Sequence, residues 1–142
     1  MGLYIGTRMK TLLKALPIFF ILMIKPVVAD EPSVFFIEPL DGAVVEETFE
    51  IIFGVNGMSL APAGTYEPST GHHHLIIDSP LPNLAMPVPS SSRYLHFGKA
   101  QDRTNITLSP GIHTLQLLLG DGNHFPHNQP LISKKITIEV KP

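Results

Sequence analysis

Histidines are the side chains of this 142-residue sequence with the greatest capacity for chemistry, and there are seven of them. Five fall in two short stretches: the run His72–His74 in GHHHLIID, and His124 and His127 in GDGNHFPHN. An imidazole binds transition metals when neutral and changes charge near neutral pH. Such clusters therefore indicate a metal site, a pH-sensitive surface or ordinary packing, and position along the elements has to decide among the three.

The histidine run leads directly into the apolar segment LIID, which is typical of a buried strand. Side chains alternate across a strand, so His72 and His74 share one face while His73 shares the other with Leu75 and Ile77. The Cα atoms of His72 and His74 are then about 6.6 Å apart, a spacing at which two imidazoles converge on one ion. A closed site usually needs three or four ligands, so further donors are required.

The loop GDGNHFPHN can supply those donors, because a loop that follows one strand of a sandwich can lie near the end of a neighbouring strand. The predicted metal ligands are His72, His74, His124 and His127. Other available donors are His96, Met58 and Met86. Nitrogen and sulfur ligands favour copper or zinc over magnesium or calcium.

Simpler interpretations remain open for each histidine. His72 and His74 can be partly buried rings that are hydrogen-bonded to the backbone or to Asp78. His124 and His127 can organise a proline-restrained loop. For His73 we expect a hydrogen-bonded position at the edge of the core, and for His96, between Leu95 and Phe97, strand packing or a strand edge.

The first 29 residues predict a cleavable signal peptide. Lys10 and Lys14 supply positive charge, 16–24 is a short apolar run, and Val27-Val28-Ala29 is a small-residue cleavage site. The run is too short for a stable membrane anchor. We therefore expect a periplasmic or secreted protein without a membrane anchor after cleavage, with residues 30–142 as a single domain.

Charge and cysteine content exclude several classes of partner. Beyond the leader there are six basic residues against twelve acidic ones, so no basic patch for nucleic acid is visible. The chain has no cysteine, which excludes a lipid-anchored cysteine and a disulfide framework. A protein of the cell envelope or the extracellular space fits these constraints.

The elements that must position the histidines read as short strands. Twelve of the fourteen prolines lie beyond the leader, and no segment has a helical period. The pattern predicts an all-β, immunoglobulin-like antiparallel β-sandwich of about seven strands. The predicted strands are 34–37, 48–55, 73–78, 94–97, 105–108, 112–119 and 135–140. The segment 79–92, with four prolines, is predicted to be irregular and either mobile or partner-facing.

One local pattern supports the sandwich. The segment 108–115, LSPGIHTL, is laid out like the corner before the sixth strand of such folds, where a tyrosine often folds back to bond the preceding loop. His113 occupies the tyrosine position, so we interpret it as a corner residue.

Three blocks together resemble a known family: GHHHLIID, YLHFGKAQ and PGIHTLQLLLGDGNHFPHNQPLISKKITIEV. They are similar to the signatures of small exported bacterial domains catalogued only as a domain of unknown function, over residues 36–140. The resemblance implies a short, secreted or periplasmic, β-rich protein. It implies no activity.

An enzyme is not predicted. The serines lie in loops without a nucleophile-elbow motif, and paired carboxylates are scarce. A copper/zinc superoxide dismutase also uses H-x-H on a strand, but it has cysteines and a zinc loop that this sequence lacks. The sequence therefore predicts an exported, non-enzymatic binding domain that holds copper or zinc through clustered histidines. The alternative is a metal-free interaction or structural module that contacts another protein of the cell envelope.

Overall fold

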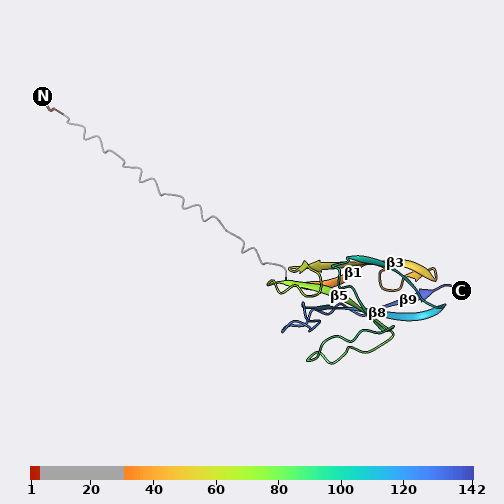
Figure 1. Ribbon diagram of the computed structural model, residues 1–142. Helices are drawn as coiled ribbons and strands as arrows, with labels where there is room; N and C mark the ends of the chain where they lie inside the picture. Colours follow the sequence, from red (N-terminus) through yellow and green to blue (C-terminus); the bar gives the residue numbers. More distant parts are fainter. Residues whose placement is uncertain (4–30) are drawn as a thin grey trace.

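Two β-sheets packed face to face form the body of the protein (Figure 1). The computed structural model describes residues 1–3 and 31–142. Most of the predicted signal peptide lies outside these residues. The described part of the chain contains strands and loops but no helix, so it has no helix of the length and apolarity that crossing a membrane requires. The predicted all-β class and the sandwich are confirmed.

The smaller sheet has three antiparallel strands in the order β1-β3-β7. They are β1 (Ser33–Glu38), β3 (Thr48–Asn56) and β7 (Arg103–Thr107). The alternation of TFEIIFGV turns Phe49, Ile51 and Phe53 inward, and all three side chains are buried. β1 and β7 are the edges of this sheet.

The larger sheet has the order β2-β9-β8-β5-β4, with β6 also paired to β5. Its strands are β2 (Val44–Val45), β4 (Ser59–Leu60), β5 (Thr70–Ile77), β6 (Tyr94–His96), β8 (Gly111–Gly120) and β9 (Ile136–Val140). The long pairings are antiparallel, whereas the two-residue strands β2 and β4 pair in parallel with β9 and β5. These two short strands are the only described strands that the sequence pattern did not predict.

The core lies between the sheets and depends on β5 and β8. Leu75 of β5 and Leu115, Leu117 and Leu119 of β8 are fully buried and pack against the inward side chains of the smaller sheet. Full burial of one such leucine contributes roughly 1.5–3 kcal/mol. The central pair β5–β8 is therefore the rigid base on which the histidine run is mounted.

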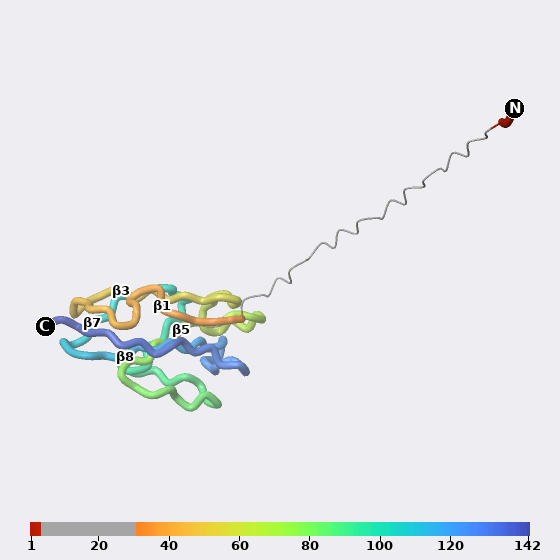
Figure 2. Tube along the Cα trace, turned by 180° about the vertical axis from the view of Figure 1, so that it is seen from behind, coloured from red at the N-terminus to blue at the C-terminus, as the bar shows by residue number. Residues whose placement is uncertain are grey.

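The outer face of β5 is covered as well. The proline-rich segment 79–92 is irregular, as predicted, but it packs back on the sheet: Val88 is buried with Ile76 and Leu118 in a second, smaller cluster. Both views place this green segment on the outer side of the larger sheet (Figures 1 and 2). Because β5 is covered on both faces, all of residues 71–77 are buried.

The predicted corner is confirmed. His113 Nε2 lies 2.8 Å from the carbonyl oxygen of Ser109, four residues upstream, and Nδ1 lies 2.6 Å from Oδ2 of Asp78. Both partners only accept hydrogen bonds, so both ring nitrogens must donate and the ring is an imidazolium. Burial opposes this charge, but the Asp78 and Ser109 hydrogen bonds raise the pKa of His113 above its usual value of 6.5. Asp78 Oδ1 also accepts the Thr114 amide, which ties β8 to the end of β5.

Replacing His113 with alanine is expected to lower the free energy of unfolding by about 2 kcal/mol at pH 6, because a hydrogen bond to a charged group is lost at a largely buried site. A raised pKa stabilises the native state fully below pH 6.5, and this contribution is lost as the pH rises through the native pKa. Urea unfolding should therefore show a smaller loss at pH 9 than at pH 6. Lys141→Ala, which removes only the exposed pair with Glu46, is the control and should change little. An equal loss at both pH values would contradict a charged corner.

Candidate metal centre

Strand β5 carries the first two histidines of the site. It lies between β8 and β6, with His72 opposite Gly120 of β8 and His74 opposite both Leu118 of β8 and His96 of β6. His72 and His74 have no exposed surface, and their ring centroids are 4.8 Å apart. The alternation predicted from the sequence therefore places both rings on one face of the sheet.

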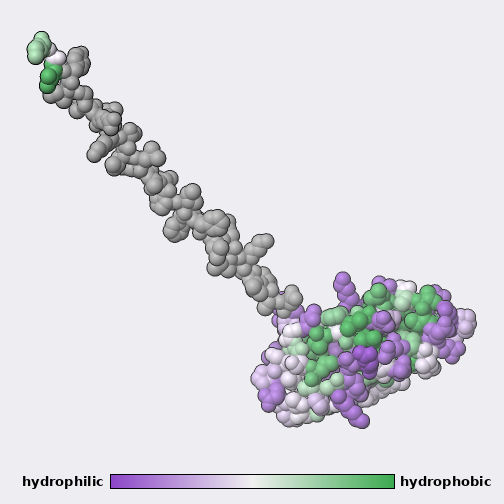
Figure 3. Space-filling view, turned by 90° about the horizontal axis from the view of Figure 1, so that it is seen from above, coloured by the Kyte–Doolittle hydropathy of each residue, from purple (hydrophilic) through white to green (hydrophobic). Residues whose placement is uncertain are grey.

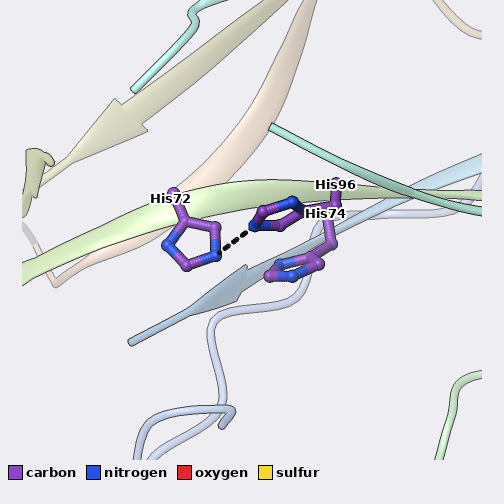
Figure 4. A group of neighbouring side chains, drawn as sticks. All are labelled: His72, His74 and His96. Carbon is purple, nitrogen blue, oxygen red and sulfur yellow. Dashed lines mark hydrogen bonds between the residues drawn. The ribbon is translucent and has the colours of Figure 1, made fainter. Parts of the chain in front are cut away.

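His96, the last residue of β6, brings a third ring to the same place. Its Nε2 atom lies 3.2 Å from Nε2 of His72. Each of His72, His74 and His96 offers a ring nitrogen within 4.8 Å of the other two. Figure 4 shows the three rings turned toward one another, with the close contact between His72 and His96 drawn as a dashed line.

His124 adds a fourth ring from the loop that follows β8. Its Nε2 atom lies 3.1 Å from Nε2 of His96, and its centroid lies 5.1 Å from that of His72 and 6.0 Å from that of His74. We call His72, His74, His96 and His124 the histidine cluster. Three of its members lie on paired strands, and only His124 lies in a loop.

The loop of His124 is shaped by Asp121. One carboxylate oxygen of Asp121 accepts the amides of Asn123 and Phe125, at 2.8 and 2.9 Å. Inside this tight turn His124 takes a φ of 69°, in the left-handed region that non-glycine residues rarely adopt. Its carbonyl oxygen accepts the amide of Val88, so the proline-rich segment also holds this residue in place. The turn directs the His124 ring toward the cluster.

His127 does not join the cluster. None of the ring contacts among the described residues links it to the four clustered rings, although it is near enough for its charge to affect His72. It instead lines pockets with Met58, Ser69 and Asp121. Of the four predicted ligands, the structure thus brings His72, His74 and His124 together and leaves His127 outside, while ligation itself stays a prediction.

The simpler interpretation of His72 and His74 has little support in the hydrogen bonds. Asp78, the partner considered for them, is engaged by His113 instead. In the described part of the chain, Nδ1 of His72 has no hydrogen-bond partner. The ring nitrogens of His74 form no hydrogen bond of good geometry, although the Leu118 backbone lies close enough to act against the lowering of the His74 pKa. Buried polar atoms are normally paired, since leaving one unpaired costs about 1–3 kcal/mol. A hydrogen bond to Asp78 therefore does not explain the burial of these rings.

His73 differs from its sequence-based expectation. It faces the core as predicted, with its ring centroid 5.0 Å from that of Phe53, but it is fully buried and neither ring nitrogen has a partner among the described residues. A hydrogen-bonded ring at the core edge was expected. The difference arises because the smaller sheet covers this face of β5 with apolar side chains that cannot accept or donate hydrogen bonds.

The environment keeps the buried rings neutral. Burial lowers the pKa of His72 to about 4, and the neighbouring rings of His96 and His124 add to the shift. Burial and then the His72, His96 and His124 rings lower the pKa of His74 to about 3. The pKa of the His96 ring is also lowered, by burial and by His124. A neutral imidazole has a free lone pair for a metal, so these rings are in the binding form at neutral pH.

Two separations between ring nitrogens match those around a single ion. Four nitrogens bound at about 2.0–2.1 Å around zinc lie about 3.3 Å from one another. The His72–His96 and His96–His124 contacts, at 3.2 and 3.1 Å, are close to this value, while the converging nitrogens of His72, His74 and His96 all lie within 4.8 Å of one another. With no cysteine in the chain and no carboxylate in the group of converging ligand atoms, the donor set is composed of imidazoles.

His96 is the member of the cluster that the sequence offered only as an additional donor, with strand packing or a strand edge expected instead. Its apolar neighbours Leu95 and Phe97 favoured a packing role, and the distance of 22 residues from His74 concealed the relationship. The register of β5 and β6 places it directly opposite His74. The one available signal was the glycine at 98, which leaves room beside the ring of His96.

Comparison with known proteins gives a family but no activity. Residues 51–141 match the family model described as "Domain of unknown function (DUF4399)". No curated protein matches the chain.

Two solved structures are similar at low level. The endo-beta-1,4-mannanase from Thermotoga petrophila has a TM-score of 0.46 at 15% identity, over 78% of this chain and 20% of the mannanase. The PKD domain of human KIAA0319 has a TM-score of 0.40 at 15% identity, over 82% of this chain and 87% of that domain. The chain therefore spans about a fifth of the length of the mannanase.

The metal-free protein is expected to lose stability in acid. In the unfolded chain, His72, His73 and His74 take up protons near pH 6.5. In the native protein their pKa values are lowered, so they take up protons only at about pH 4 or below. The free energy of unfolding should fall between pH 6.5 and 4, by at most about 1.4 kcal/mol per pH unit for each histidine. Urea unfolding at pH 7, 6 and 5 in the presence of a chelator measures this slope.

His73→Leu serves as the internal check on that slope. It removes one of the three buried histidines whose pKa is lowered. The slope of the free energy of unfolding against pH should therefore decrease by the contribution of about one proton. The shift of Asp78 acts below pH 3.8, and that of His113 acts mainly above pH 6.5 with the opposite sign, so the slope between pH 6 and pH 5 is the one to compare. Stability that is constant from pH 7 to pH 5 would refute the buried, neutral state of these rings.

Proposed function

We propose that this chain, which belongs to the DUF4399 family, a domain of unknown function, is an exported binding domain that holds copper or zinc in the histidine cluster. The observation that carries the proposal is the convergence of four imidazoles, two of them fully buried, with nitrogens 3.1–3.2 Å apart at the closest contacts. Export to the periplasm or beyond rests on the predicted signal peptide.

The character of the cluster supports binding rather than catalysis. The pKa values of His72, His74 and His96 are lowered, and these rings have no carboxylate in hydrogen-bonding contact that would turn one of them into a general base. His72 and His74 form a buried floor, whereas His96 is exposed and His124 half-buried. An ion can therefore enter from the His96 side and meet two rings that are already fixed by the sheet.

Calorimetric titration with Zn²⁺ and Cu²⁺ at pH 7 tests the proposal. One ion should bind per chain, with micromolar affinity or tighter. Removing an outer partner of a metal ligand already costs about 10–100-fold in affinity, so His72→Ala, His74→Ala and His96→Ala should each cost more than about 100-fold. His127→Ala should cost much less, since this ring lies outside the cluster.

The matched control is His73→Leu. It changes the same residue type on the same strand, but on the face turned to the core, so the affinity should be retained. Absence of binding of either metal by the folded wild-type protein would end the proposal, as would full binding by His72→Ala and His96→Ala.

A protein-contact role is the second candidate, and the apolar surface of β1 favours it. Phe35 and Ile37 on this edge strand and Leu40 after it are 38%, 48% and 68% exposed. Figure 3 shows apolar surface gathered on the side of the molecule seen from above. Edge strands with exposed apolar side chains are sites where another chain can add.

Pull-down from envelope extracts with wild-type protein and with Ile37→Lys tests this candidate. A specific partner lost on Ile37→Lys and kept by His96→Ala would support a contact role at β1. The same partners with both variants would argue against it. Deletion of residues 79–92 would not separate the two roles, because that segment packs against β5 and its loss would disturb the cluster.

A further inference from the structure

We propose that the histidine cluster is built for a tetrahedral ion and selects Zn²⁺ over Cu²⁺, and that Gly98 and Gly120 set this preference by fixing two of its rings. The inference rests on the proposed metal-binding function and names the ion within it. Three observations carry it: the relative positions of all four rings, the glycines behind two of them, and the composition of the donor set.

The ring positions distinguish the two coordination geometries. A tetrahedral ion with metal–nitrogen bonds of about 2.0–2.1 Å places all six pairs of ring centroids about 5 Å apart. A square-planar ion places four pairs at about 4.5 Å and two opposite pairs at about 6.3 Å. The six observed separations are 4.7, 4.8, 4.9, 5.1, 5.2 and 6.0 Å.

No division of the four rings into opposite pairs reproduces a square. The one long separation, 6.0 Å between His74 and His124, would have to be matched by a long separation between His72 and His96, which is 4.9 Å. The five shorter values instead scatter around the tetrahedral expectation. The four ring centroids are thus distributed in three dimensions and do not lie in one plane.

Gly98 provides the surface against which the His96 ring rests. A Cβ atom at position 98 would overlap the ring at Cε1 and lie 2.6 Å from Nε2. Gly98 does not have a positive φ, so its backbone conformation does not require glycine. The glycine is needed for space, because any side chain here would push the His96 ring away from His72 and His124.

Gly120 plays the same part for His74. A Cβ atom there would lie 2.6 Å from Cε1 and 3.1 Å from Nδ1 of His74. Gly120 is also the residue opposite His72 in the β5–β8 register and the last residue of β8. The buried His74 ring is held between this backbone and the other rings, so it cannot swing outward to make a square plane.

The fixed positions of the rings oppose the usual order of metal affinities, in which Cu²⁺ binds more tightly than Zn²⁺. Flexible nitrogen ligands bind Cu²⁺ more tightly than Zn²⁺, and Cu²⁺ prefers a tetragonal arrangement. Zn²⁺ has no electronic preference and accepts the tetrahedron that the sheet provides. Rings fixed on paired strands would have to move for Cu²⁺ to gain its preferred geometry, and such movement costs packing at β5 and β8.

Cobalt and a competition titration test the inference in the full folded chain. Co²⁺ should give the intense visible absorption of four-coordinate tetrahedral cobalt, and Zn²⁺ should abolish it stoichiometrically. With one equivalent each of Zn²⁺ and Cu²⁺, most chains should retain Zn²⁺. The reverse result, Cu²⁺ displacing Zn²⁺ with a tetragonal paramagnetic resonance spectrum, would overturn the selectivity and leave metal binding intact. If none of the three ions binds, the proposed function itself fails.

The glycines are tested with a matched control. Gly98→Ala should weaken Zn²⁺ binding by at least tenfold and diminish the tetrahedral cobalt absorption, with little change in urea stability because the exposed His96 ring can move away. Gly54→Ala is the control: its Cβ would overlap the ring of Phe35 just as closely, but on the other sheet. It should leave the zinc affinity and the cobalt spectrum unchanged. Unaltered zinc binding and spectrum in Gly98→Ala would overturn the role assigned to this glycine.

Discussion

Burial of unpaired imidazoles on strand β5 is the constraint around which the rest of the structure is organised. Burying a polar group without a hydrogen bond costs free energy, and His72 and His74 both bury ring nitrogens that have no well-formed hydrogen bond among the described residues. Desolvation lowers the pKa of each ring, so neither recovers the cost by taking up a proton at neutral pH. An ion is the partner that we propose for several of these nitrogens.

The free-energy cost of burying these imidazoles falls on the most strongly stabilised strand of the fold. β5 is packed on both faces and paired with its neighbours along its length, so the apolar burial around Leu75 and Leu117 holds the strand despite its polar residues. The charged corner of His113 and Asp78 anchors the far end of the same strand. The Asp121 turn then adds a fourth ring, His124, to three that the sheet has already aligned.

Much of this arrangement could be predicted from the sequence. Alternation in TFEIIFGV and KITIEV, together with the spacing of turn signals, is local information, and it predicted the strands and the sandwich. The placement of His72 and His74 on one face of β5 and of His73 on the other follows from the same two-residue period. The corner role of His113 was also readable from LSPGIHTL.

The remainder depended on long-range register and on loop geometry. His96 enters the cluster because β6 pairs with β5 at His74, and no local pattern specifies that pairing. His124 and His127 look equivalent in GDGNHFPHN, but the Asp121 turn and the unusual φ of His124 send one ring into the cluster and leave the other outside. Whether the ring nitrogens of His73 form hydrogen bonds could not be predicted either, because this depends on which side chains of the smaller sheet cover the ring.

We propose that four imidazoles on one side of the larger sheet hold a single tetrahedral ion. A crystal structure of the zinc-soaked protein, with anomalous diffraction recorded on both sides of the zinc edge, can test this arrangement. We expect one strong anomalous peak about 2.0–2.1 Å from a ring nitrogen of each of His72, His74, His96 and His124. A peak elsewhere on the chain, or none between these rings at full zinc loading, would contradict it.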